Sequence, residues 1–135
     1  MVLSLIADLY SRGGDKLIIY SISNDTVLNI GNKIIDFKQN IKKIIEIRGI
    51  LIVHIFDDID KKGYIEMPKQ PINGVYAIDS NGDIQWNIKE IFKSDNMYTN
   101  IQKDEDGGLK VSTFDGIEYK IDIVNQKIIS SSFTK

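Results

Sequence analysis

Short apolar segments separated by polar turns recur along the chain. In residues 117–123 every odd-numbered position is apolar and every even-numbered position is polar or charged, and residues 84–88 alternate in the same way. A period of two points successive side chains to opposite faces of a strand, so both segments predict antiparallel strands with one solvated face. Residues 50–56 are apolar except for His54, which predicts a central strand covered on both faces.

Turn sequences delimit these segments. Asn81-Gly82 and Asp115-Gly116 are typical of two-residue hairpin turns, because type I′ turns require positive φ. Residues 88–93 suggest one helical turn, and residues 2–10 are ambiguous between helix and strand, with a strand favoured. The sequence therefore predicts one all-β domain over residues 1–135, an antiparallel meander of about ten strands. The segments expected as strands are 2–10, 16–23, 26–30, 33–37, 41–47, 50–56, 75–80, 83–88, 98–103, 109–114, 117–124 and 127–133.

The longest stretch without a strand pattern, residues 57–73, contains both prolines. Proline cannot donate to a sheet ladder, so this stretch is expected to be a loop, and long loops often carry binding residues. Three lysines in the stretch offset its acidic side chains, so a solvated loop is the alternative to a partner-binding surface. The candidate partner-binding residues are Asp57, Asp58, Asp60 and Glu66.

A weak repeat joins distant parts of the chain. Residues 75–86, 117–128 and, more faintly, 17–28 each place a tyrosine two residues before an isoleucine, followed by a polar turn and another apolar residue. The tyrosines, Tyr20, Tyr76 and Tyr119, lie 56 and 43 residues apart. A period near 43 residues is the length of one four-stranded propeller blade.

The first hairpin of this repeat resembles a blade hairpin of pyrroloquinoline-quinone-type β-propellers. Residues 82–86 and 116–122 also resemble small uncharacterised β-meander proteins of low-GC Gram-positive bacteria, a likeness that implies a fold and no activity. The quinone-binding residues of the propeller enzymes have no counterpart here. The matching positions of the hairpin are Tyr76, Ala77, Ile78, Asp79, Gly82 and Trp86.

The chain is too short for a closed propeller. Closure needs at least about four blades, and 135 residues supply about three. The sequence therefore leaves open a partial propeller with blade-like repeats, a barrel or a sandwich. Sheet edges that such a fold leaves unpaired favour a homodimer as one expectation.

Composition narrows the function classes. Isoleucine occurs 27 times and leucine only seven times, which favours strands over helices. The absence of cysteine excludes a disulfide framework, a thiolate metal site and a thiol nucleophile, and the single histidine excludes a multi-histidine metal site. A formal net charge of −2 gives no general attraction to nucleic acid, and no apolar run is long enough to span a membrane. We expect a cytoplasmic protein without cofactor or metal.

Three candidate sites remain, each with a structural alternative. His54 with Asp57 and Asp58 could serve a hydrolase, but a strand histidine hydrogen-bonded in an apolar setting is the favoured interpretation, with His54 on the same face as Phe56. The second candidate is a set of oxygen-bearing residues at the spacing of a calcium loop. The same residues also fit an Asn-Gly hairpin, and the sixth position lacks the glycine that a calcium loop requires. Its residues are Asp79, Asn81, Asp83 and Glu90.

The third candidate is aromatic. Trp86 and Tyr76 could stack on a sugar or another small ligand, although alternating strand aromatics are more often core residues. No phosphate loop, dinucleotide fingerprint or nucleophile elbow is present, so we assign no catalytic residue. The leading hypothesis is a non-enzymatic protein-binding domain, in its narrower form an immunity-type inhibitor that caps a bacterial toxin domain. The alternative is a small-ligand or carbohydrate-binding β domain.

Overall fold

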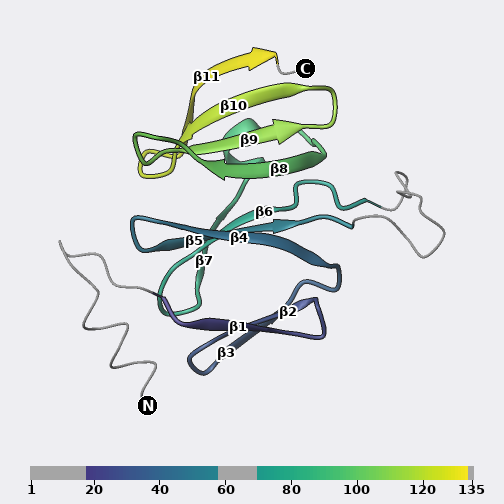
Figure 1. Cartoon of the computed structure of the whole chain (residues 1–135), viewed down its shortest axis with the longest axis vertical. Coiled ribbons are helices and arrows are strands. Elements are labelled where there is room, and N and C mark those ends of the chain that lie inside the picture. The colour runs from purple at the N-terminus through teal and green to yellow at the C-terminus, as the bar shows by residue number, and fades with distance from the viewer. Residues whose placement is uncertain (1–17, 58–69, 134–135) are drawn as a thin grey trace.

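Three antiparallel sheets lie one above another in the computed structural model, which describes residues 18–57 and 70–133 (Figure 1). Within each sheet, strands consecutive in sequence are neighbours. The N-terminal sheet contains β1 (Tyr20–Ser23), β2 (Val27–Ile30) and β3 (Lys33–Asp36). The central sheet contains β4 (Ile41–Ile47), β5 (Ile50–Ile55), β6 (Val75–Ile78) and β7 (Ile84–Asn87). The C-terminal sheet contains β8 (Tyr98–Lys103), β9 (Leu109–Thr113), β10 (Ile117–Asp122) and β11 (Lys127–Phe133).

The all-β meander is confirmed, and so is the helical turn expected within residues 88–93, here α2 (Lys89–Phe92), which links the central and C-terminal sheets. The barrel alternative is wrong for the described strands, because the first and last strands of each sheet are not paired with each other. The strand expected over residues 2–10 lies outside the described residues. Over the described ranges, no helix is long and apolar enough to cross a membrane.

Two apolar layers hold the stack together, because the central sheet buries both of its faces. On β5, Leu51, Val53 and Ile55 pack toward the N-terminal sheet and Ile52 packs toward the C-terminal sheet, so the prediction of a strand covered on both faces is confirmed. The first layer is completed by Leu28, Ile30 and Ile78. The second is completed by Ile47, Val75, Ala77, Trp86, Ile88, Tyr98, Ile101, Leu109, Val111 and Ile121.

The repeat has a structural counterpart in two of its three segments. Tyr76 and Tyr119 lie on the third strands of their sheets, and a register shift follows each of them by one residue, at Ala77/Ile78 and at Lys120/Ile121. An aspartate three residues after each tyrosine, Asp79 or Asp122, accepts hydrogen bonds from backbone amides of the next turn. Tyr20 lies instead on the first strand of its sheet, so the fainter third segment does not share this structural position. Kinship with propeller blades stays a prediction.

Both ends of the stack present polar side chains. On the outer face of the N-terminal sheet, Asn29 donates to Ser23 Oγ at 2.7 Å. On the outer face of the C-terminal sheet, Lys120 pairs with Asp104 at 2.7 Å, and Lys110 lies 3.8 Å from Glu118. A polar outer face caps a stacked array, so the described C-terminal end offers no apolar layer on which a further sheet could pack.

Candidate functional site

The predicted acidic loop is described only at its base. Asp57 belongs to the described chain, whereas Asp58, Asp60 and Glu66 lie outside it. The Asp57 amide donates to Gln70 Oε1 at 2.8 Å, and Gln70 Nε2 donates to the Asp57 carbonyl at 2.6 Å. Gln70 is buried, so its side chain ties together Asp57 and Gln70, the described residues on either side of positions 58–69.

His54 is buried and hydrogen-bonds across from the central sheet to the C-terminal sheet. Its Nε2 lies 2.7 Å from the carbonyl oxygen of Tyr98 on β8, and because a carbonyl only accepts, Nε2 carries the proton. The imidazole stacks on Phe56 with ring centroids 5.8 Å apart, so the predicted shared face is confirmed. Asp58 lies outside the described residues, and the Asp57 carboxylate accepts the amide of Asn40 at 3.4 Å. These contacts fit the structural interpretation of His54.

Trp86 and Tyr76 lie on opposite faces of the central sheet, so the structure does not bring them together. Trp86 pairs in register with Ala77, the neighbour of Tyr76, and successive strand residues face opposite sides. Tyr76 packs on Phe37 with centroids 5.0 Å apart, toward the N-terminal sheet, while Trp86 is buried in the second apolar layer. A stacking platform built from both aromatic rings is therefore wrong, although Trp86 still borders a cavity described below.

The calcium-like spacing forms the hairpin turn that was its alternative. Asp79 Oδ1 accepts the amides of Asn81 and Asp83 at 2.9 and 3.0 Å. The Asp83 carboxylate pairs with Lys33 at 3.0 Å, and Glu90 accepts the amide of Asn87 at 2.8 Å. Each carboxylate therefore has a protein partner. Among the residues that the structure describes, no group of three or more histidines, aspartates or glutamates could hold a metal ion.

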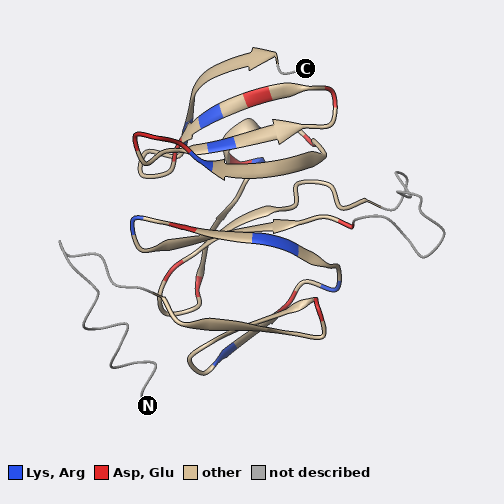
Figure 2. Ribbon diagram, in the orientation of Figure 1, with Lys and Arg blue, Asp and Glu red and all other residues tan. Residues whose placement is uncertain are grey.

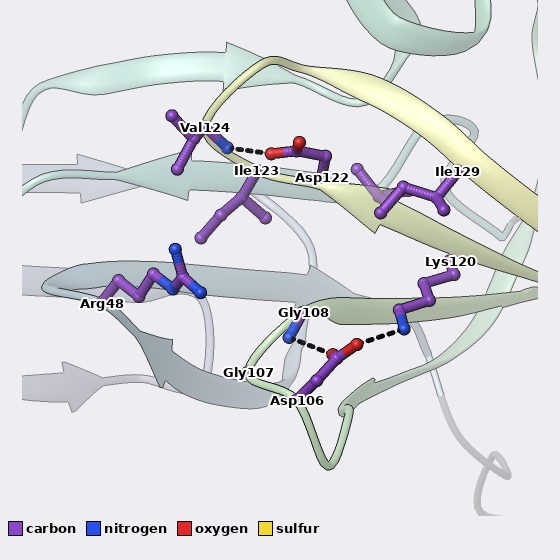
Figure 3. Close-up of a pocket in the computed structure, with 10 residues that line it drawn as sticks. Arg48, Asp106, Gly107, Gly108, Lys120, Asp122, Ile123, Val124 and Ile129 are labelled. Atoms are coloured by element: carbon purple, nitrogen blue, oxygen red, sulfur yellow. Dashed lines mark hydrogen bonds and ion pairs between the residues drawn. The ribbon is translucent and has the colours of Figure 1, made fainter.

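A cleft opens between the central and C-terminal sheets, where the β4–β5 turn meets two turns of the C-terminal sheet (Figure 3). It consists of two cavities of about 290 and 230 Å³ that share Arg48, Ile123 and Val124. The larger cavity is bordered in addition by the β8–β9 turn at residues 106–108 and by Lys120, Asp122 and Ile129. The smaller is bordered by Ile50, Gln85, Trp86 and Gln126.

The charged groups of the cleft are paired, with one exception. Asp106 accepts the Gly108 amide and pairs with Lys120, and Asp122 accepts two amides of its own turn. These turn amides hold the pKa of Asp122 below its usual value. The guanidinium of Arg48 makes no hydrogen bond or ion pair with any residue in the described part of the chain. It lies beside the Gly107 backbone, so that a Cβ there would stand 3.8 Å from Nη2.

The two edges of the C-terminal sheet differ. On β8, the carbonyl of Ile101 accepts from Lys43 Nζ at 2.7 Å and the carbonyl of Tyr98 accepts from His54, so central-sheet side chains cover this edge. On β11 every residue is exposed, Ile129 by 53% and Phe133 by 84%. No charged residue follows Lys127 within the strand, and the β11 arrow in Figure 2 is neither blue for Lys and Arg nor red for Asp and Glu. Natural proteins normally protect such an edge with charges, proline or short length.

This three-sheet unit corresponds to a known protein family. A family model described as a domain of unknown function, DUF7957, matches residues 19–133, from β1 to the end of β11. The chain belongs to the DUF7957 family. No curated protein and no solved structure matches it. Membership in DUF7957 thus gives the extent of the domain and leaves its function to be argued from its surface.

Sequence reasoning missed both the cleft and the edge. Arg48 occupies the first position of a two-residue turn with φ of 51°, where asparagine, aspartate or glycine is usual. An arginine at such a position was the available sequence signal for the cleft. Residues 127–133 were correctly predicted as a strand. The signal for an open edge was the run of six uncharged residues after Lys127.

Proposed function

We propose that this DUF7957 domain is a non-enzymatic, cytoplasmic protein-binding domain that takes an extended segment of a partner protein along β11. The free edge of β11 carries the proposal. An edge strand presents a row of unpaired amides and carbonyls, and an extended segment of another protein can complete that row as an added strand.

The chemistry of β11 specifies the partner segment. Exposed Ile129 and Phe133 offer apolar contacts on a strand whose remaining exposed side chains are mainly serines. Because the strand bears no charge after Lys127, a complementary segment is itself extended, apolar and uncharged. A toxin domain, inhibited in the manner of an immunity protein, is the narrower form of this proposal.

The test introduces positive charges on the edge strand β11. Tagged wild-type domain retains proteins from extracts of its source cells, and each retained protein is purified and its affinity measured by calorimetry. The double variant Ile129→Lys/Phe133→Lys should weaken binding at least about tenfold, because two desolvated charges oppose strand addition. The matched control Ile34→Lys changes another exposed isoleucine, 72% exposed on β3, and should leave the affinity unchanged.

Three outcomes contradict the proposal. The wild-type domain retains no protein, or the double variant binds its partner as tightly as wild type does. In the third, light scattering after size exclusion shows a dimer that the double variant dissociates, which assigns the edge to a second copy of the chain. The proposal predicts a monomer for the isolated domain.

A further inference from the structure

We propose that the Arg48 cleft is a binding site for a small organic carboxylate with an apolar body. The site is separate from strand addition at β11 and does not depend on it. It would provide the small-ligand binding that the sequence pattern suggested as the alternative function of Trp86 and Tyr76, with residues of the β4–β5 and β10–β11 turns in place of Tyr76.

The cationic part of the site is the guanidinium of Arg48. Its planar fork of N–H donors matches a carboxylate bidentately, and such charge-assisted pairs are stronger than neutral hydrogen bonds. The neighbouring cation, Lys120, already contacts Asp104 and Asp106. Arg48, which has no partner among the described residues, is therefore the cation available to a ligand.

The apolar part lies beside it. Ile123 and Val124 border both cavities, and Ile50 and Trp86 line the smaller one. Figure 3 shows Ile123 and Val124 above the Arg48 side chain, on the β10–β11 turn. A ligand whose anionic group pairs with Arg48 can thus place its apolar body against these side chains. Cavities of about 290 and 230 Å³ are below the usual range of about 300–1,000 Å³ for drug-sized ligands, so the ligand is small.

The local charge favours a carboxylate over a phosphate. The larger cavity is bordered by two cations, Arg48 and Lys120, and by two carboxylates, Asp106 and Asp122. A ligand with one negative charge balances the unpaired guanidinium, whereas a phosphate dianion would face the two aspartates with a surplus charge. Selectivity for singly charged anions follows from this arrangement.

The experiment is an NMR titration of the full chain with three probes: phenylacetate, the uncharged phenylacetamide and inorganic phosphate. Phenylacetate should produce saturable shifts at the Arg48 side-chain N–H, the Trp86 indole N–H and the amides of Ile123 and Val124. Arg48→Gln should weaken it at least about tenfold. The control, Lys38→Gln, alters another exposed basic residue at positive φ, which is not among the residues that line the cleft, and should leave the affinity unchanged.

Glutamine already occupies the left-handed region at Gln126, so Arg48→Gln is compatible with a folded turn. The proposal is overturned if phenylacetate gives no saturable shift in the cleft, or if phenylacetamide binds as well as phenylacetate. It is equally overturned if Arg48→Gln keeps the wild-type affinity or if phosphate binds more tightly than the carboxylate.

Discussion

His54 shows how one side chain can look catalytic in a sequence and serve the fold in the structure. The sequence places it just before two aspartates, but β5 buries it completely and aims it at the Tyr98 carbonyl. Alternation along a strand was enough to predict its face and its stacking on Phe56. The identity of its hydrogen-bond partner was not predictable, because Tyr98 lies 44 residues away on another sheet.

Truncation of His54 should therefore be costly to stability. His54→Ala leaves a cavity and deprives the buried Tyr98 carbonyl of its donor, so we expect a loss of about 2–4 kcal/mol in the free energy of unfolding. Urea unfolding followed by Trp86 fluorescence measures it. The control Ile34→Ala, on an exposed side chain, should change stability by less than about 0.5 kcal/mol. A neutral His54→Ala variant would contradict the structural role.

Asp104 carries a second prediction at this scale, on pH dependence. The Lys120 ammonium, 2.7 Å away, lowers the pKa of Asp104 from 3.8 to about 2. A depressed pKa in the folded state stabilises the fold above the unfolded value, and this contribution is lost as the pH falls from about 4 toward 2. In Lys120→Gln, an NMR titration of the carboxyl carbon should show the pKa of Asp104 moving back toward 3.8, and added salt should have a similar, smaller effect. An unchanged pKa in that variant would refute the assignment.

The strands were predicted more accurately than the turns between the sheets. Strands β4, β8 and β11 begin and end at the expected residues, because turn dipeptides and period-two alternation are local signals. Contacts between elements are not local. The β6–β7 turn packs against β3, where Lys33 pairs with Asp83 at 3.0 Å, and no pattern within either segment indicated this.

Gly82 tests that packing of one element on another. Its φ is +83°, and an added Cβ would lie 2.6 Å from Lys33 Cβ and Cγ. Gly31, at φ +55°, has no atom within 4 Å of the same position. Both Gly→Ala variants incur the left-handed backbone cost of about 1–2 kcal/mol, and Gly82→Ala should lose about 1–3 kcal/mol more from the clash, measured by urea unfolding. Equal losses for the two variants would show that β3 does not press on this turn.

On the scale of the whole molecule, the question raised by the short chain was how a partial propeller would protect its sheet edges. The C-terminal end presents the polar outer face of the last sheet, and the alternation over residues 117–123 indicated its polar positions Glu118 and Lys120. The edges are protected unevenly, since side chains of Lys43 and His54 bind carbonyls of β8, while every residue of β11 is exposed. Which edge stays open depends on how the sheets stack. That stacking brings together residues far apart in the chain, so the sequence alone did not indicate the open edge.

Amide hydrogen exchange of the domain, alone and bound to the partner that it retains, tests this account most directly. Strand addition at β11 predicts that amides within residues 128–133 which exchange rapidly in the free domain become protected in the complex, since an added strand accepts their hydrogen bonds. The β8 edge and the outer face of the N-terminal sheet should exchange as before. Protection confined to other strands, with β11 still exchanging freely in the complex, would contradict the claim that this edge binds the partner.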